Sequence, residues 1–458
     1  MPTLNRKKRS SLSNSLPDKK GKEFVLSKAE EFNVKFIRLW FSDTLGLLKS
    51  FAITIDELKE AMEEGKFFDG ASIEGFARSD ESDMRAFPDP STFQLLPWRP
   101  KENSVARMFA DIKDANGGPF VGDPRQCLKR NLKKASDLGY TFYVGPEIEF
   151  YYFQNSEGTQ TLDQGGYFDL TSLDAGSDLR RETVLTLEEM GIGVESSHHE
   201  AAPSQHEIDL RYTDALTMAD NAITYRLVVK EIALKNGVYA TFMPKPLKGE
   251  NGSGMHVHQS LFKGDQNAFY DKSDKNHLSK LAKHYIAGLL KYAPEMCIVT
   301  NQWANSYKRL VPGFESPVYV FWAKRNRNAL VRLPAYKPGY ESAIRAELRL
   351  PDAACNPYLA FSVMLAAGLE GIRQGLELPE PVEQNIHDMT EADRKKKGIR
   401  LLPQSLGEAI AIAQESKFLK DALGEHIFHS LLENKKIEWD KYCAEITDYE
   451  LKKHLPIL

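Results

Sequence analysis

The chain contains 458 residues, of which 42% are hydrophobic and 27% are charged, and its formal net charge is −4. This length allows two or three domains with a large core, and the composition is ordinary for a soluble globular protein. The slightly negative charge argues against nucleic-acid binding by bulk electrostatics. No apolar run approaches the roughly 20 residues that cross a bilayer, and the first residues lack the apolar segment of a signal peptide. We therefore expect a cytoplasmic protein with no membrane or nucleic-acid partner.

The cysteines are few and scattered, with no Cys-x-x-Cys pair: Cys127, Cys297, Cys355 and Cys443. This usage suits a reducing cytosol. It provides neither a zinc cluster nor a disulfide framework.

The first 22 residues are rich in serine, lysine and arginine and include the basic run Arg6–Arg9. Like charges with almost no apolar content are typical of a solvated tail. The alternative is that this basic segment is a targeting signal or a phosphate-binding arm. We expect residues 1–22 to form a disordered basic tail and assign it no function.

Residues 23–119 are expected to form a small domain of short strands and turns around one helix. Phe36–Ser42 alternates as a strand, Asp43–Gly46 forms a turn, and Leu47–Ile53 returns as the second strand of a hairpin. This hairpin is the first regular feature of the chain.

A helix is predicted to follow the hairpin. Thr54 is its candidate N-cap, Glu57 would complete a capping box, and Gly65 would end it. Beyond the helix, the acid- and hydroxyl-bearing segments Phe68–Ile73 and Glu81–Met84 are predicted to be loops.

Residues 120–458 mix strands with longer helices and show no internal repeat. Amphipathic patterns and capping residues predict helices at Pro124–Leu138, Leu179–Met190, Asp214–Lys235, Leu278–Tyr292 and Pro357–Gly375. Short helices with lysine-rich connections are expected near the C-terminus.

Two pairs of polar residues alternate along predicted strands. Glu147 and Glu149 follow an aromatic and β-branched run, so both carboxylates face one side of the strand. His256 and His258 share one face of a later strand in the same way. Two histidines at this spacing can be surface residues by chance. Neighbouring like charges, however, are tolerated comfortably only when cations neutralise them.

A third acidic cluster lies between these pairs and consists of Glu195, Glu200 and Glu207. Three histidines are interleaved with it, namely His198, His199 and His206. Carboxylate oxygens with one imidazole are the ligand set expected for Mg²⁺ or Mn²⁺, whereas structural zinc favours thiolates. The sequence therefore predicts a divalent-cation site.

An arginine-rich region begins at Asn305–Glu315 and continues through Arg325, Arg327, Arg332, Arg345 and Arg349. Arginines among proline, glycine and aromatic residues suit forked contacts with carboxylates and phosphates. Structural salt bridges to the acids are the alternative for any single arginine. Near a cation site, several guanidinium groups favour a polyanionic substrate such as a nucleotide with a carboxylic acid.

The absence of two phosphate-binding motifs argues against two classes of enzyme, the P-loop NTPases and the protein kinases. The chain lacks both the P-loop pattern and the kinase glycine loop. The residues alone therefore predict metal-dependent phosphoryl transfer of another class.

From about Phe36 onward the chain resembles type I glutamine synthetase, through segments that follow the family's order: Phe68–Ile73, Gly145–Phe150, Lys245–Pro246, Asn251–Ser260, Asn305–Glu315 and Arg345–Arg349. The resemblance implies an α+β fold with a β-grasp-like domain at 23–119. It also implies a catalytic domain at 120–458 with a curved antiparallel sheet flanked by helices. The implied reaction joins ammonia to the γ-carboxylate of L-glutamate through γ-glutamyl phosphate, using ATP and two Mg²⁺ or Mn²⁺ ions.

Matching positions imply the binding residues. The implied metal ligands are Glu147, Glu149, Glu200, Glu207, His256 and Glu347. The implied glutamate-binding residues are Glu149, Asn251, Gly252, His256, Arg309, Glu315, Arg327 and Arg349. The implied ATP-binding residues are Glu195, Tyr212, His258, Ser260, Arg327, Arg332 and Arg345.

The resemblance also implies the catalytic residues. Asp69 and Ser72 would serve the ammonium half of the reaction, with Asp69 helping to deprotonate ammonium. Glu315 would lie on a flap that excludes water, and Arg327 would stabilise the transferred phosphate. In the family, Asp69 and Ser72 would complete the site of the neighbouring subunit, so a dodecamer is expected.

Three positions bear on the subgroup. Ala71 stands where the family commonly has serine, and His387 replaces a tyrosine that some members have adenylylated, which makes control by adenylylation doubtful. Arg78 resembles the subgroup that glutamine inhibits directly. The alternatives are a ligase for another amine, a guanidino kinase and a non-catalytic structural member.

Overall fold

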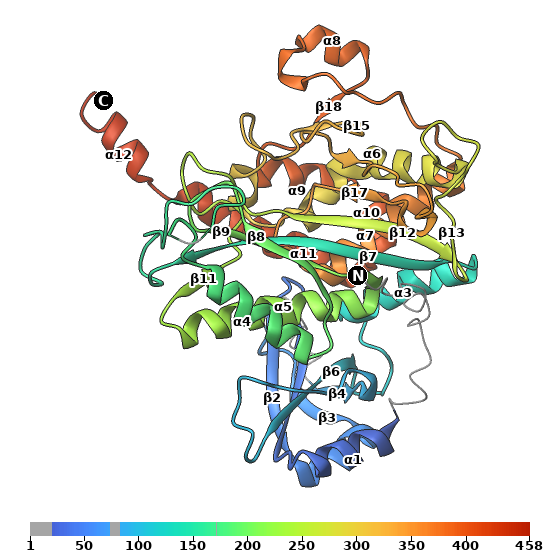
Figure 1. The fold of residues 1–458 in the computed structure, drawn as a ribbon, viewed down its shortest axis with the longest axis vertical. Helices are drawn as coiled ribbons and strands as arrows, with labels where there is room; N and C mark the ends of the chain where they lie inside the picture. The colour runs from blue at the N-terminus through green and yellow to red at the C-terminus, as the bar shows by residue number, and fades with distance from the viewer. Residues whose placement is uncertain (1–20, 74–82, 171) are drawn as a thin grey trace, which may run out of the picture.

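The computed structural model describes residues 21–73, 83–170 and 172–458. Within these residues the chain forms a small N-terminal domain, blue at the lower end of Figure 1, and a much larger domain above it. Each domain has its own buried apolar core. The predicted α+β class is confirmed. Arg78 and residues 1–20 of the predicted tail lie outside the described residues.

The small domain is built on a sheet with the strand order β2-β1-β6-β4-β3, with the short β5 beside β6. Its strands are β1 (Phe36–Ser42), β2 (Leu48–Thr54), β3 (Lys66–Asp69), β4 (Asp83–Pro88), β5 (Gln94–Leu95) and β6 (Val105–Lys113). Its helices are α1 (Lys22–Glu31) and α2 (Leu58–Glu64). Strands β1 and β6 run parallel, so the sheet is mixed. The β1–β2 hairpin confirms the predicted one.

Three local predictions for this domain were wrong. Helix α1 was missed; its amphipathic signal is weak and only Val25 and Ala29 are buried. The capping box at Thr54 is absent because a 3₁₀ turn precedes α2 and the Thr54 side chain makes no capping bond. The loop prediction was wrong only at Phe68–Asp69 and Asp83–Met84, which join the β3–β4 pair with Phe68 opposite Met84; Gly70–Ile73 forms a turn as expected. Phe68 also packs on Phe41, and this tertiary contact outweighs the local turn chemistry.

The large domain is built on a curved sheet of ten strands within the described residues, with the main order β15-β16-β17-β12-β7-β9-β8. The strands are β7 (Thr141–Phe153), β8 (Val194–His199), β9 (Gln205–Leu210), β10 (Thr213–Asp214), β11 (Tyr239–Thr241), β12 (Met255–Lys263), β13 (Gln266–Asn267), β15 (Trp322–Ala323), β16 (Val331–Arg332) and β17 (Ala346–Leu348). The sheet is antiparallel except at β15–β16, a parallel pair that corrects the prediction. A separate pair joins β14 (Tyr319–Val320) to β18 (Arg400–Leu401).

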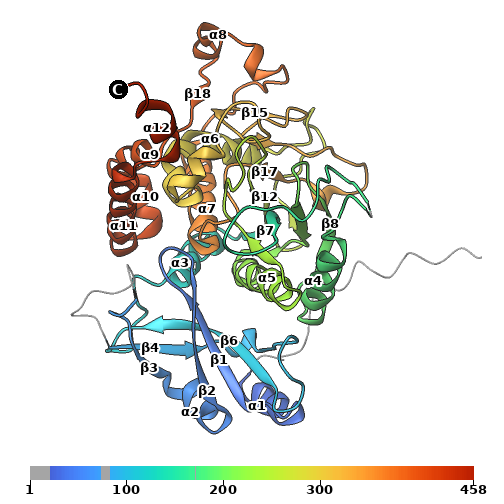
Figure 2. The same ribbon diagram turned by 90° about the vertical axis from the view of Figure 1, so that its left-hand side faces the viewer.

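The helices cover the sheet and extend the core. They are α3 (Pro124–Asp137), α4 (Ser177–Glu189), α5 (Ala215–Lys235), α6 (Lys280–Thr300), α7 (Pro357–Gln374), α8 (Glu391–Lys396), α9 (Leu406–Gln414), α10 (Lys417–Leu423), α11 (Glu425–Ala444) and α12 (Asp448–His454). Figures 1 and 2 show α4 and α5 between the sheet and the small domain. The side chain of Asn356 caps α7, and Gly375 ends it in a left-handed conformation, as expected.

Two helices are longer than predicted. Helix α6 continues to Thr300 past Pro294, because most of its residues are buried and tertiary packing maintains the helix. Helix α11 runs through 20 residues where short helices were expected. Among the described residues, no helix is long and apolar enough to cross a membrane.

Candidate active site

Three neighbouring strands bring the predicted acidic residues together. Strand β7 lies between β12 and β9. In the register of these strands, Glu147 pairs with His256 and Glu149 pairs with Glu207. Side chains alternate between the two faces of a strand, so Glu147 and Glu149 lie on the same face of the sheet as His256 and Glu207. Glu200 joins them from the turn between β8 and β9.

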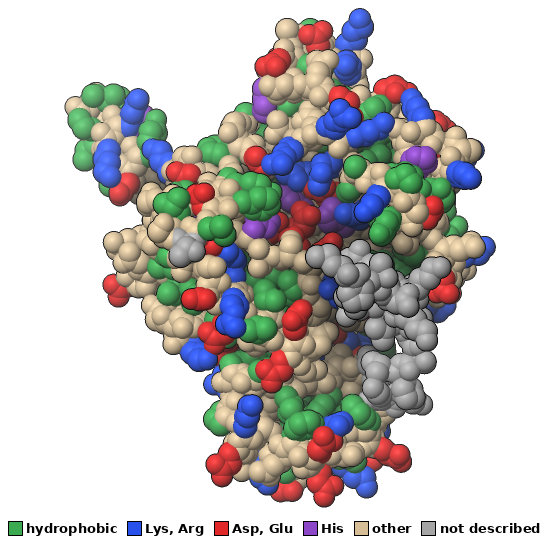
Figure 3. Space-filling view, viewed as in Figure 1, with side chains coloured by type: hydrophobic (Ala, Val, Ile, Leu, Met, Phe, Trp, Pro, Cys, Tyr) green, Lys and Arg blue, Asp and Glu red, His purple; other side chains and the backbone are tan. Residues whose placement is uncertain are grey.

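These five residues line a cavity of about 580 Å³, together with Asn251, Gly252, Glu315, Arg327, Arg332 and Arg349. Figure 3 shows acidic side chains and histidines in a central hollow, with basic side chains along its upper edge. The structure thus brings together eleven of the predicted site residues from segments far apart in the sequence. Such a cavity suits a small anionic ligand bound with cations.

Burial of like charges controls the electrostatics of this cavity. Burial, reinforced by Glu200, raises the pKa of Glu149 to about 7. Burial and the nearby Asp209 raise the pKa of Glu207 well above its usual range. Burial and the Arg349 guanidinium lower the pKa of His256 to about 4, so its imidazole is neutral at pH 7. A neutral imidazole among buried carboxylates is the state in which a histidine binds a metal.

The donor set fits divalent cations. Glu147, Glu207 and His256 offer ligand atoms that lie within 4.8 Å of one another. His198, Glu200 and Glu207 form a second group of this kind. His256 Nε2 is buried and has no hydrogen-bond partner among the described residues, which leaves it free to bind a cation. Oxygen ligands with one nitrogen suit Mg²⁺ or Mn²⁺.

Glu347 lies beside this cavity but its carboxylate is already paired. It is fully buried and accepts hydrogen bonds from Arg332 Nε at 2.5 Å and Arg349 Nη1 at 2.7 Å. Although burial opposes it, Arg349 lowers the pKa of Glu347. Glu347 faces His258 across the β12–β17 pair, so it is close to the cluster from the opposite side of β12.

A second cavity of about 330 Å³ adjoins the first. It is lined by five of the residues predicted to bind ATP, namely Glu195, Tyr212, His258, Ser260 and Arg345. Glu147, Ser196 and Asp209 line both cavities and so form their shared wall. His258 connects the two, because its Nε2 donates to Glu147 Oε1 at 2.6 Å and its Nδ1 accepts from Arg345 Nε at 3.1 Å.

Arg309 is buried behind the first cavity. Its guanidinium donates to the carbonyl oxygens of Leu350 at 3.0 Å and Arg349 at 3.2 Å. A Cβ added at Gly252 would lie 2.9 Å from Arg309 Cγ and 2.3 Å from Pro244 O, so only glycine fits there. Arg309 therefore supports the glycine segment and does not itself line the cavity.

Glu315 and Arg327 lie at the open edge of the first cavity. Arg327 Nη1 is 3.7 Å from Glu315 Oε1, and both side chains are more than half exposed. The neighbouring Phe314 ring lies 3.5 Å from Lys245 Nζ, a cation–π contact that attaches this segment to the large domain.

Asp69 and Ser72 are not brought to either cavity of their own chain. They lie at and just after the end of β3 in the small domain, where Ser72 Oγ donates to Asp69 Oδ2 at 2.6 Å. This bond, with the Ala71 amide, lowers the pKa of the exposed Asp69 carboxyl.

Sequence reasoning missed several residues that line the first cavity. The His198 imidazole lies 2.9 Å from Glu200 Oε1, so the cluster contains more than the single imidazole expected. Tyr167 and Phe168 stack on each other and contact the edge of His198. Gln205 Nε2 donates to Glu149 Oε2 and Gly252 O, both at 3.1 Å. His198 could have been found from its place in the histidine-rich run, whereas no local signal marks the other three.

A small mixed-sheet domain joined to a large sheet with an acid-lined double cavity defines a two-domain enzyme of anionic substrates. Family models agree: residues 33–115 match the β-grasp domain of glutamine synthetase and residues 121–454 match its catalytic domain. The chain therefore belongs to the glutamine synthetase family.

Individual relatives support this assignment. The chain is 53% identical to the glutamine synthetase of Mycolicibacterium smegmatis, covering 95% of this chain and 99% of that one. It is 51% identical to the glutamine synthetase of Methanosarcina mazei, covering 95% and 98%. The solved structure of Plasmodium falciparum glutamine synthetase superposes with a TM-score of 0.86 at 25% identity, covering 94% of this chain and 98% of that one.

Proposed function

We infer that this member of the glutamine synthetase family forms L-glutamine from L-glutamate, ammonia and ATP. The observation that carries this conclusion is the convergence of Glu147, Glu149, Glu200, Glu207 and His256 in one cavity that shares a wall with a second. A carboxylate resists attack by amines because oxide is a very poor leaving group. Phosphorylation to γ-glutamyl phosphate replaces oxide with phosphate, which leaves readily.

We propose that the first cavity holds two divalent cations, Mg²⁺ or Mn²⁺. Glu149, Glu200 and Glu207 would hold the ion nearer glutamate, and Glu147, His256 and Glu347 would hold the ion at the ATP phosphates. The bound ions would shield the phosphate charges and favour the displacement. The orphaned His256 Nε2 and the raised pKa of Glu149 support this assignment, because both are relieved by a cation. Glu347 would have to exchange an arginine contact for the ion.

The nucleotide would occupy the second cavity, with its terminal phosphate directed toward the shared wall at Glu147. Glutamate would bind in the first, beside Asn251 and Gly252, with Arg349 and the supporting Arg309 supplying positive charge. Arg327 would stabilise the phosphate during transfer. Closure of the Glu315 segment would exclude water from the acyl phosphate, and Glu315 would accept a proton from the attacking amine.

Asp69 and Ser72 would bind ammonium and help to deprotonate it. Because they lie away from both cavities of their own chain, this role requires a second subunit. We therefore propose a homo-oligomer, a dodecamer of two hexameric rings, in which each small domain completes its neighbour's site. The protein would act in the cytoplasm.

Two positions, Arg78 and His387, bear on how the activity is regulated. Arg78 would take part in direct inhibition by glutamine, so Arg78→Ala should remain active while losing sensitivity to glutamine. Unchanged inhibition in this variant would reject the idea. His387 is exposed within the 3₁₀ turn Ile386–Asp388 and offers no tyrosine hydroxyl for adenylylation.

The central test is an assay of purified protein with glutamate, ATP, Mg²⁺ and ammonium, measuring glutamine and ADP. Equimolar glutamine and ADP are expected. A parallel panel of amines distinguishes ammonia from methylamine or a polyamine as the acceptor. ADP formation with none of these amines would contradict the proposed function.

A further inference from the structure

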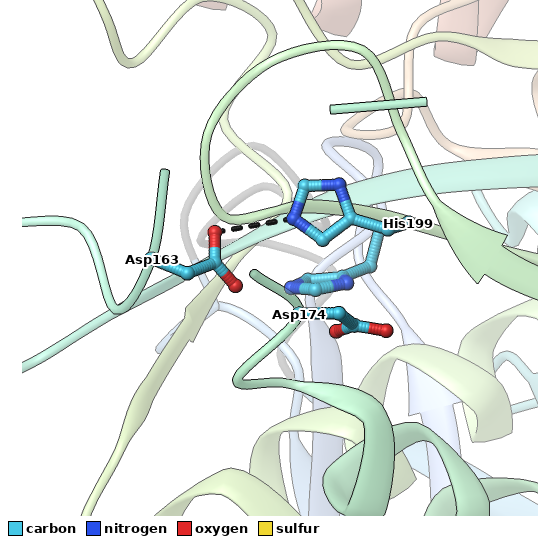
Figure 4. A group of neighbouring side chains, drawn as sticks. Asp163, Asp174 and His199 are labelled. Carbon is cyan, nitrogen blue, oxygen red and sulfur yellow. Dashed lines mark hydrogen bonds and ion pairs between the residues drawn. The ribbon is translucent and has the colours of Figure 1, made fainter. Parts of the chain in front are cut away.

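A second polar cluster adjoins the first cavity at the turn that carries Glu200, and its member His199 lines that cavity. Its members Asp163, Asp174, His199 and His206 are all buried, and their ligand-type atoms lie within 4.8 Å of one another. Asp163 and Asp174 come from the long connection between β7 and α4, and the two histidines come from β8 and β9. Figure 4 shows the Asp163 carboxylate directed at the His199 ring.

An arginine already supplies the positive charge in this cluster. Arg180 donates to both oxygens of Asp174, at 2.9 and 2.6 Å. Its Nη1 also lies 2.8 Å from His206 Nδ1, which must accept. The guanidinium therefore occupies the position that a cation would need, and the cluster is built to hold protein segments together.

Asp163 is bonded to both ends of the turn that carries Glu200. At the start of the turn, His199 Nε2 lies 3.1 Å from Asp163 Oδ1. At its end, the Ser204 amide donates to the same oxygen at 2.8 Å, and Ser204 Oγ accepts from the Leu162 and Asp163 amides. Ser204 has a φ of +59°, a conformation that costs energy for a residue other than glycine and needs such support.

His199 links Asp163 to the backbone of Glu200. Its Nδ1 lies 2.6 Å from the Glu200 carbonyl oxygen, which can only accept, so the ring donates there. The Glu200 amide donates to Gln205 O at 2.7 Å across the turn. Both backbone groups of Glu200 are thereby held. Glu207, by contrast, lies within β9 and is held by the strand ladder on both sides.

We propose that Asp163, acting through His199 and Ser204, is a positioning residue that fixes Glu200 for cation binding. This inference rests on the proposed role of Glu200 as a metal ligand. Residues that orient a metal ligand typically change metal affinity 10–100-fold when they are replaced. Asp163 touches neither cavity, so its effect on a bound cation would be indirect.

The test is a direct titration of Mn²⁺ into the purified oligomer, comparing wild type, Glu200→Gln, Asp163→Asn and the double variant. We expect Asp163→Asn to weaken Mn²⁺ binding about 10–100-fold. The double variant should bind no more weakly than Glu200→Gln alone, because positioning has no effect once the ligand is lost.

Asp123→Asn is the matched control. Asp123 is also buried and accepts backbone N–H groups on both oxygens, from Ile112 and Arg125, but it lies at the start of α3, away from both cavities. Both variants should lower Tm, and only Asp163→Asn should change Mn²⁺ affinity. If Asp163→Asn does not fold, His199→Gln removes the donor to the Glu200 carbonyl and should weaken Mn²⁺ binding in the same direction.

The outcomes separate this inference from the proposed function. Normal Mn²⁺ affinity in folded Asp163→Asn or His199→Gln, or additive losses in the double variant, would overturn the positioning role. If Glu200→Gln itself binds Mn²⁺ like the wild type, the metal assignment of Glu200 fails and the positioning role fails with it.

Discussion

Glu149 and Glu207 lie directly opposite each other in the β7–β9 pair. Two carboxylates in this relationship repel each other, and burial increases the cost. Both line the first cavity, where a bound cation would offset this repulsion.

This relationship predicts opposite effects of Glu207→Gln with and without cation. In EDTA at pH 8 the variant should melt about 2–4 °C above the wild type. A buried acid with a raised pKa costs stability at a pH where the unfolded chain is ionised, and the variant lacks that acid. With saturating Mn²⁺ the order should reverse, since the wild type gains binding energy that the variant lacks. Thermal melting in both buffers checks this. A variant less stable than wild type in EDTA would contradict it.

The buried carboxyl of Asp123 predicts a pH-dependent contribution to stability. Burial raises its pKa from 3.8 to about 6. The folded state then binds the proton more tightly than the unfolded state, so this contribution is present below about pH 4 and is lost as pH rises through about 6. Its size is on the order of 3 kcal/mol per chain. The Tm difference between wild type and Asp123→Asn should therefore be largest at low pH, and an equal difference at pH 4.5 and 7 would refute this.

The crowding at Gly252 predicts a selective loss of glutamate binding. Gly252→Ala would drive a methyl group into Pro244 O and the Arg309 side chain. We expect KM for glutamate to rise at least about 10-fold, with little change in ATP binding, since a displaced backbone misaligns the substrate. Gly158→Ala is the control, because a Cβ there meets nothing within 4 Å. Equal kinetics in the two variants would show that the close approach has no role.

The separation of Asp69 from the cavities of its own chain predicts complementation between inactive variants. Asp69→Ala and Glu200→Gln should each lose most glutamine formation, and Asp69→Ala should still bind ATP. If the two are unfolded together and reassembled, random mixing should restore roughly a quarter of the wild-type activity, because some sites combine two intact halves. Assays of the mixed and separate samples check this. No recovery in well-formed mixed oligomers would argue for sites within single chains.

Sequence reasoning succeeded where a local pattern determines the structure. The alternation of Glu147 with Glu149 and of His256 with His258 identified two strand faces, and the structure shows β7 and β12 side by side. The helix start at Asn356 was predicted correctly for the same reason, since the capping residue and the backbone amides that it binds lie within a few residues of each other.

The remaining features depend on contacts between distant segments. Phe68 looked like part of a loop because its pairing with Met84 and its packing on Phe41 are not local. The connection from Asp163 to His199 and Ser204 could not be predicted, since 36 residues separate Asp163 from His199. Family resemblance supplied the site residues as a set, but it did not indicate the contacts that connect Glu200 to Asp163 through His199.

The wall at Glu147, Ser196 and Asp209 belongs to both cavities, and this limits how the enzyme can be altered or inhibited. If each cavity holds one substrate as proposed, a substitution in this wall would affect the binding of both substrates. If the nucleotide binds in the second cavity as proposed, altered nucleotide preference is better sought at residues that line that cavity alone, such as Tyr212 and Ser342. An inhibitor that spans this wall would need both cavities empty, so it would compete with each substrate and a saturating concentration of either would displace it.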